Sequence, residues 1–252
     1  MTQDITIERP QAHPGIVVIR MTRPDKKNAI TRDMYGAMAV ALGDANEDDA
    51  VQAVVLFGMP GCFSAGNDLA DFLAISDDPD QARNVKAFLH QLASFGKPLL
   101  SGVDGVAIGI GTTINMHCDM TFATARTVFR TPFTDLAVVP EAASSLIAPR
   151  LMGQQRAFAL LVAGLPFTAE DAREAGLVWK VVDEEGLETA TLEAASQLAA
   201  KPRQALRLSR QLLRGESHDI RDRMDEEMKL FIECLRSDEA SALYESFLDK
   251  KR

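Results

Sequence analysis

Three short apolar segments, each followed by a turn and a further element, most constrain how this chain folds. They begin at Ala53, Leu99 and Met120, and the first of them, Ala53 to Phe57, is apolar at every position. An apolar run of this length is typical of a strand buried on both faces, and buried strands joined by crossover elements form parallel sheets. The spacing therefore predicts an α/β fold of stacked βα turns around a largely parallel sheet.

Local signals define the elements before and after these turns. Residues 5–7 and 15–21 read as two strands of a hairpin, and residues 32–46 as a helix with Thr31 as N-cap. Ser144 or Ser145 is expected to cap a helix that ends near Leu151, and Thr168 opens a segment that resembles a capping box. From residue 187 onward the pattern is helical. We therefore predict a core over residues 1–195 and a helical C-terminal region over residues 196–252.

Two glycine-containing loops are candidate ligand sites. The turn from Gly105 to Gly111 separates the strand that starts at Leu99 from a predicted helix over residues 110–118, and a second loop covers Phe63 to Leu69. Glycine lets the backbone approach a ligand closely, and the first turn of a helix offers unpaired N–H groups at the positive end of its dipole. Both loops suit an anionic group, and the alternative interpretation is ordinary turns packed in a core.

Glu141, directly after Pro140, is the candidate proton-transfer residue. An acid after proline at the start of a helix also interacts favourably with the helix dipole without any further duty. The residues alone leave both interpretations open. Met224, Met228, Phe231 and Leu235 recur at helical spacing and are interpreted as core or subunit contacts.

Charge and composition exclude several classes of partner. Thirty-six acidic residues against 27 basic ones give a formal charge of −9, which opposes binding to nucleic acid or anionic membranes. Neither a run of about 18 apolar residues nor a signal-peptide pattern in residues 1–10 is present. The C-terminal residues lack a Ser-Lys-Leu type of address, so a cytoplasmic location is expected. Three cysteines without CxxC spacing and four scattered histidines predict no metal site.

Several ordered motifs together resemble one known family. They are Arg23-Pro24 with Asn28-Ala29, the loop Phe63 to Leu69, Lys97-Pro98 with Gly105 to Gly109, Cys118-Asp119, Thr131-Pro132-Phe133, and Ala175 to Val178. This set resembles the crotonase, or enoyl-CoA hydratase/isomerase, superfamily, whose members act on acyl-CoA thioesters. The resemblance implies a spiral of βα turns with a helical C-terminal region used for trimerisation, as a homotrimer or a dimer of trimers. It implies no cofactor, because coenzyme A is part of the substrate.

The resemblance also implies an oxyanion hole made of two peptide N–H groups, from Ala65 and Ile110. Such preorganised donors stabilise the charge that forms on a thioester oxygen. Asp68 is also interpreted as an acceptor that fixes its loop, and Lys27, Lys250 and Lys251 are further candidates for the CoA phosphates. The expected substrate or CoA contacts are Lys26, Ala29, Ser64, Gly66, Asn67, Asp68, Leu69, Gly109 and Phe133.

The acids narrow the expected chemistry within the family. Typical hydratases of the family activate water with two glutamates, and the matching positions here hold Thr113 and Phe133. Threonine is no carboxylate base and phenylalanine excludes water. The segment through Glu141 resembles the branch that isomerises 3-enoyl-CoA to 2-enoyl-CoA in fatty-acid breakdown, with Glu141 moving a proton from C2 to C4. Burial among residues 138, 139 and 146 is expected to raise the pKa of Glu141.

Other activities stay open. Leu136-Ala137-Val138 stands where many relatives have Leu-Gly, and relatives with similar loops carry out hydration and other acyl-CoA reactions. An enoyl-CoA hydratase, another crotonase-type enzyme and a noncatalytic acyl-CoA-binding protein are the alternatives. A dinucleotide site is disfavoured, because Ile114 occupies the place of the third glycine of its fingerprint.

Overall fold

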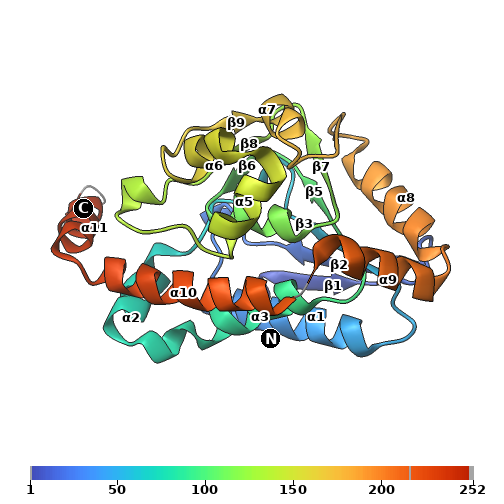
Figure 1. Ribbon diagram of the computed structural model, residues 1–252, viewed down its shortest axis with the longest axis horizontal. Coiled ribbons are helices and arrows are strands. Elements are labelled where there is room, and N and C mark those ends of the chain that lie inside the picture. The colour runs from blue at the N-terminus through green and yellow to red at the C-terminus, as the bar shows by residue number, and fades with distance from the viewer. Residues whose placement is uncertain (1, 216, 250–252) are drawn as a thin grey trace.

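The apolar segments that open the predicted βα turns lie side by side in one six-stranded sheet (Figure 1). In the computed structural model, which describes residues 2–215 and 217–249, the order is β1(Ile5–Glu8), β2(Ile16–Met21), β3(Ala53–Phe57), β5(Leu99–Val103), β7(Met120–Thr124) and β10(Lys180–Val182). Neighbouring strands are parallel except in the hairpin of β1 and β2. The predicted parallel sheet and the N-terminal hairpin are confirmed.

A second sheet of four short strands explains the spiral. Its order is β4(Cys62–Ser64), β6(Val106–Ile108), β8(Val128–Arg130) and β9(Phe167–Thr168). The strands β3, β5 and β7 of the large sheet each continue through a short turn into β4, β6 and β8 of the small one. Three similar strand–turn–strand units therefore stack on one another, because both sets of strands pair in parallel.

Helices cover both faces of the large sheet. One face packs under α1(Arg32–Glu47) and α3(Arg83–Ser94), and the other packs against α8(Leu187–Ala199). The shorter helices α2(Leu69–Asp77), α4(Ile110–Thr113) and α7(Ala169–Glu174) follow β4, β6 and β9. Helices α5(Ser144–Met152) and α6(Gln154–Leu161) come one after the other between β8 and β9. Single 3-10 turns cover Pro24–Lys26, Pro79–Ala82, Ile114–His117 and Thr134–Leu136.

Two of the three predicted helix caps are confirmed. The Thr31 hydroxyl accepts the N–H of Met34 at the start of α1, and Thr168 forms a complete capping box at the start of α7. The prediction for α5 is wrong. The residue before α5 is Ala143, in a left-handed conformation and without a side-chain cap, and the Ser144 hydroxyl has no hydrogen-bond partner among the described residues.

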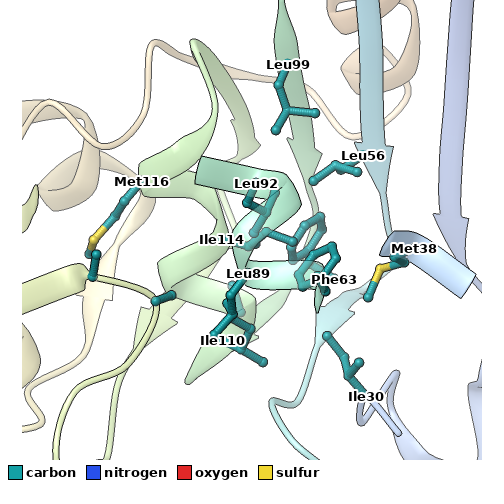
Figure 2. Packing of buried hydrophobic residues seen from close by; sticks show 14 of the residues in the cluster. Ile30, Met38, Leu56, Phe63, Leu89, Leu92, Leu99, Ile110, Ile114 and Met116 are labelled. Carbon is teal, nitrogen blue, oxygen red and sulfur yellow. The ribbon is translucent and has the colours of Figure 1, made fainter. Parts of the chain in front are cut away.

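The main core reaches from the large sheet to the two glycine-containing loops. Figure 2 shows Phe63 from β4 among Leu89, Leu92, Ile110 and Ile114, all of them buried. The backbone of each loop is therefore attached to a side chain that is fixed in the core. This arrangement gives the loops the rigidity of the surrounding close-packed interior.

The last three helices are α9(Arg203–Arg214), α10(Ser217–Leu235) and α11(Asp238–Asp249). In Figure 1, α9 and α10 cross the front of the molecule and α11 lies at its left end. Helix α10 packs on α2 and α3. Helix α9 is joined to the core by Arg210, which pairs with Asp119 at 2.7 Å and donates to the Phe95 carbonyl at 2.5 Å. Because α8 runs through residue 195, no break in the helix marks the boundary of the two predicted regions, and this division stays a prediction.

The turn between β5 and β6 gives a test of the stacked units. Gly105 has a φ of +70°, and a Cβ there would lie 1.9 Å from the carbonyl oxygen of Gly61 in the neighbouring turn. Gly153 has a φ of +78° with open space around it. We expect Gly153→Ala to lower the free energy of unfolding by about 1–2 kcal/mol through the positive φ alone. Gly105→Ala should lower it by a further ~2 kcal/mol, because backbone must move.

Urea denaturation of both variants measures this difference in the free energy of unfolding. Equal losses for the two variants would contradict the close stacking of the two turns.

Candidate active site

Glycines bring the two candidate loops into backbone contact. A Cβ on Gly66 would lie 3.0 Å from the Ile108 carbonyl oxygen, and a Cβ on Gly111 would lie 2.8 Å from the Ser64 carbonyl oxygen. Side chains at either glycine would force the loops apart. The loop after β4 and the turn before α4 therefore lie in backbone contact, although the glycine pattern alone marked them only as two separate candidate sites.

Two buried polar residues fix the loop after β4. The Asn28 amide donates to the carbonyls of Cys62 and Phe63 at 3.2 and 3.1 Å, and its oxygen accepts the N–H of Arg23 at 2.7 Å. The Ser64 hydroxyl donates to the Asn28 carbonyl at 2.8 Å and accepts the N–H of Gly66 at 3.1 Å. Ser64 is fully buried. The side chain of Ser64 therefore fixes the loop, and its expected contact with the substrate stays a prediction.

Some peptide N–H groups of the two loops donate to acceptors within the protein, and others have no acceptor among the described residues. The N–H of Ala65, expected in the oxyanion hole, donates to the Lys27 carbonyl at 2.9 Å. This hydrogen bond corrects the expectation, because an N–H that is already bonded is not available to a ligand. Within residues 2–215 and 217–249, neither the N–H of Ile110 nor that of Asn67 has an acceptor. These two N–H groups lie on the two loops that the glycines hold together.

Glu141 is a buried carboxyl group with one hydroxyl donor. It lies just before α5, is 8% exposed, and its Oε1 accepts the hydroxyl of Thr113 from α4 at 2.5 Å. Burial raises the pKa of Glu141 to about 8, the nearby charge of Glu227 raises it as well, and the hydrogen bond from Thr113 opposes them. A pKa near neutrality suits a group that takes up and returns a proton.

Glu141 and Ala142 line a mainly apolar cavity of about 50 Å³. Helices α1, α2, α3 and α10 supply most of its other walls. Sequence reasoning placed the apolar stripe of α10 in a core or subunit contact and missed this role. The apolar lining includes Ile75, Leu89, Met224, Met228, Phe231 and Ile232.

Tyr35, from α1, is a further polar group of the cavity that sequence reasoning missed. It is 1% exposed, its hydroxyl donates to the side-chain oxygen of Asn67, and its ring lies 5.4 Å from that of Phe88. Burial and the charges of Glu141 and Asp71 hold the pKa of Tyr35 well above its usual value. In the sequence, Tyr35 looks like any other apolar position of an amphipathic helix, and no motif marks it.

Asp71 is the second carboxylate on the cavity wall, and its charge is already paired. Arg32 binds it through its Nε at 3.0 Å and through its own peptide N–H at 2.7 Å. This leaves Glu141 as the cavity carboxyl group without a positively charged partner among the described residues.

The other residues expected to contact the substrate or coenzyme A have different surroundings in the structure. Asp68 accepts from Arg23 at 2.7 Å and caps α2 through the N–H of Ala70, which agrees with its interpretation as a loop-fixing acceptor. Phe133 is 4% exposed and does not line the cavity. Lys250 and Lys251 lie outside the described residues. Lys26 is exposed, Ala29 and Leu69 are half-buried, and Gly109 has a φ of +55°.

His117 serves the backbone beside Glu141. It is buried, its Nε2 donates to the Ala142 carbonyl at 2.7 Å, and burial lowers its pKa to about 4.

In the described part of the chain, no cluster of three or more His, Cys, Asp and Glu side chains is arranged to hold a metal ion. A helix long and apolar enough to span a bilayer is also absent from residues 2–215 and 217–249.

Known proteins with similar sequences share this arrangement of segments. A family model described as Enoyl-CoA hydratase/isomerase matches residues 11–252. The chain is 36% identical over 218 residues to Enoyl-CoA delta isomerase 2 of Rattus norvegicus, a match that covers 84% of this chain and 56% of that protein. It is 30% identical over 214 residues to 1,2-epoxyphenylacetyl-CoA isomerase of Escherichia coli (strain K12), with 82% of each chain covered. The chain thus spans little more than half the length of the rat relative.

Solved structures of similar proteins have the same fold as this chain. An enoyl-CoA hydratase/isomerase from Pseudoalteromonas atlantica T6c superposes with a TM-score of 0.91 at 35% identity, with 98% of each chain covered. The spiral of βα turns is therefore that of a known fold. By sequence and by structure, this chain belongs to the enoyl-CoA hydratase/isomerase, or crotonase, family.

Proposed function

We propose that this protein isomerises 3-enoyl-CoA to 2-enoyl-CoA in fatty-acid breakdown, with Glu141 as the catalytic residue. The observation that carries the proposal is the state of Glu141: a buried carboxyl group of raised pKa, facing an apolar cavity, with Thr113 as its hydroxyl donor. One such group suffices for moving a proton between two carbons of the same substrate. The similarity to an enoyl-CoA delta isomerase supports the same activity.

The proposed reaction transfers one proton and leaves the substrate formula unchanged. Ionised Glu141 removes a proton from C2, and the C–H electron pair moves to form a dienolate whose negative charge rests on the thioester oxygen. The N–H groups of Ile110 and Asn67, which have no acceptor in the described part of the chain, bind that oxygen. Protonated Glu141 then returns the proton to C4. The double bond, which joined C3 and C4 in the substrate, joins C2 and C3 in the product.

Hydration has less support at this site. The positions of the two hydratase glutamates hold Thr113 and Phe133. The hydroxyl of Thr113 is directed to Glu141, and Phe133 is buried, so neither supplies a base for water. An enoyl-CoA hydratase, another crotonase-type enzyme and a noncatalytic acyl-CoA-binding protein remain the alternatives that the substrate experiment distinguishes.

The cavity and its surroundings suggest how the substrate lies. The apolar walls from α3 and α10 suit an acyl chain, because burying that chain removes apolar surface from water. Exposed Lys26, near the loop that Asn28 fixes, is proposed to meet the phosphates of coenzyme A. The reaction as proposed needs no separate cofactor, because coenzyme A enters and leaves as part of the thioester.

Helix α9 supports the expected self-association. Leu212 and Leu213 are 85% and 89% exposed, and Leu208 on the same helix is 42% exposed. Large apolar side chains at this exposure on one helix are typical of an interface. We propose that α9 takes part in the contacts of a homotrimer or a dimer of trimers.

Replacement of the carboxyl group tests the catalytic assignment. We expect Glu141→Gln to lower kcat on 3-hexenoyl-CoA by roughly 10²- to 10⁴-fold, because the amide cannot accept the C2 proton. Absorbance of the conjugated product measures the rate, and crotonyl-CoA tests the wild-type protein for hydration. Unchanged isomerisation in the variant would rule out the assignment. Faster hydration than isomerisation, or binding without turnover, would favour one of the alternatives.

The pH dependence tests the role of Thr113. Glu141 must be ionised to take the proton, so kcat/KM should rise with pH through an apparent pKa of about 8. The hydroxyl of Thr113 lowers the pKa of Glu141, so Thr113→Val should move this acid limb to higher pH. Thr113→Ser keeps the hydroxyl and serves as the control. A limb that stays in place in Thr113→Val would show that the hydrogen bond does not act on the catalytic group.

Substitution on α9 tests the assembly. We expect Leu212→Glu combined with Leu213→Glu to shift the molar mass from a multimer to a monomer, because buried unpaired carboxylates oppose association. Size-exclusion chromatography with light scattering measures the mass. Val40→Glu on α1, where the residue is 53% exposed, is the matched control. A multimer that persists in the double variant would place the interface elsewhere.

A further inference from the structure

The backbone that follows Glu141 has an unfavourable conformation at two successive residues. Ala142 and Ala143 have φ values of +59° and +53°, in the left-handed region that alanine rarely adopts. Such a conformation persists only where surrounding contacts impose it. Because these residues connect Glu141 to α5, whatever imposes their conformation also sets the direction of the Glu141 side chain.

A buried carboxylate from the distant helix α10 makes most of these contacts. Glu227 is 4% exposed, and its Oε2 accepts the N–H of Ala143 at 2.6 Å. Its Oε1 accepts the N–H and the hydroxyl of Ser145 at 3.0 and 2.5 Å. His117 holds the other side of the segment through the carbonyl of Ala142.

Glu227 takes the place of the missing cap of α5. The helix begins at Ser144 without a capping side chain of its own, so its first N–H groups need an acceptor from elsewhere. A negative charge at a helix N-terminus is stabilised by the dipole and by the free N–H groups. Burial raises the pKa of Glu227 to about 7, and the bonds from Ser145 and Ala143 and the charge of Arg223 oppose this by favouring the ionised form.

The same turn of α10 also reaches the cavity. Met224 and Met228, three residues before and one residue after Glu227, line the cavity beside Glu141, whereas Glu227 itself does not. Both carboxylate oxygens of Glu227 are occupied by donors from the protein. Glu227 is therefore not placed to exchange a proton with a substrate.

The geometry points to Glu227 as a positioning residue, whose carboxylate on α10 holds Ala142 and Ala143 left-handed and so directs Glu141 into the cavity. This inference rests on the proposed function of Glu141. It links the helix that lines the acyl cavity to the alignment of the catalytic group. The bonds of His117 and Glu227 act on opposite sides of the same two residues, so the loss of either leaves the segment free to relax.

Charge gives the inference a second measurable consequence. Thr113 and Glu227 act on the pKa of Glu141, and the charge of Glu141 in turn raises the pKa of Tyr35. Arg223 and Ser145 face Glu227. Since the negative charge of Glu227 raises the pKa of Glu141, its removal should lower that pKa. This shift reports only the nearness of the charge, and a loss of kcat in a variant that keeps the charge reports the positioning.

Three variants separate positioning from stability. Glu227→Gln removes the charge, Glu227→Asp keeps the charge on a shorter side chain, and Glu226→Gln makes the same chemical change at a neighbour that is 62% exposed. For Glu227→Gln we expect kcat on 3-hexenoyl-CoA to fall roughly 10- to 100-fold at nearly constant KM, with the acid limb moved to lower pH. For Glu227→Asp we expect a similar loss of kcat with the limb in place. Glu226→Gln should match the wild type.

A titration without substrate keeps the inference separate from the proposed function. Infrared difference spectra between each protein and its Glu141→Gln partner follow the protonated carboxyl group of Glu141 alone. The midpoint should be lower in the Glu227→Gln background than in the wild type. A wild type that does not isomerise 3-hexenoyl-CoA would refute the proposed function, while the shifted midpoint would still show that the charge of Glu227 acts on Glu141. In an enzyme that does isomerise, an unchanged kcat in both Glu227→Gln and Glu227→Asp would overturn the inference, whatever the midpoint.

Discussion

The burial of one carboxyl group, that of Glu141, is the constraint on which this site depends. An ionised carboxylate away from water is costly unless it is paired or hydrogen-bonded. Glu141 has a single hydroxyl donor in Thr113 and no positive partner among the described residues. Its pKa is raised to about 8 as a result, so a small change in its surroundings decides whether it holds a proton. Burial beside this apolar cavity is the main cause of the raised pKa of Glu141.

The architecture holds the peptide groups of the two glycine-containing loops rigidly against each other. Three strand–turn–strand units stack in parallel, and glycines at the contacts between them let the loop after β4 approach the turn before α4. Phe63 and Ile110 anchor the two loops in the core. Donors held this way need no reorganisation when charge appears on a substrate oxygen, and this preorganisation is what makes them effective.

Much of this arrangement could be predicted from the sequence, because its signals are local. The parallel sheet follows from three apolar runs, the caps at Thr31 and Thr168 follow from neighbouring residues, and Glu141 stands out as an acid after proline. The correction at Ala65 has a different origin. Whether an N–H points toward a ligand or toward Lys27 depends on how the loop lies against another segment, and this register has no sequence signal.

The contributions of α10 could not be predicted for a similar reason. Its apolar stripe and Glu227 read as an ordinary amphipathic helix, and only the packing of α10 beside α5 gives Glu227 its acceptor role. Residues 143 and 227 are far apart in the sequence, so no spacing relates them. The sequence even concealed the need for an acceptor, because Ser144 and Ser145 look like caps of α5, and only the structure shows that the helix start lacks one of its own.

On this fold, hydration and isomerisation would require only a few different side chains. Hydration needs a water molecule held between two carboxylates, while isomerisation needs one carboxylate and a site from which water is excluded. Here Thr113 directs its hydroxyl to Glu141 itself, and Phe133 fills the second position with apolar bulk. The same fold and the same peptide donors would serve either reaction, so these two side chains and the alignment of Glu141 would decide between them. This makes the contacts that fix Glu141, from α4 on one side and from α10 on the other, as important to the chemistry as the carboxyl group.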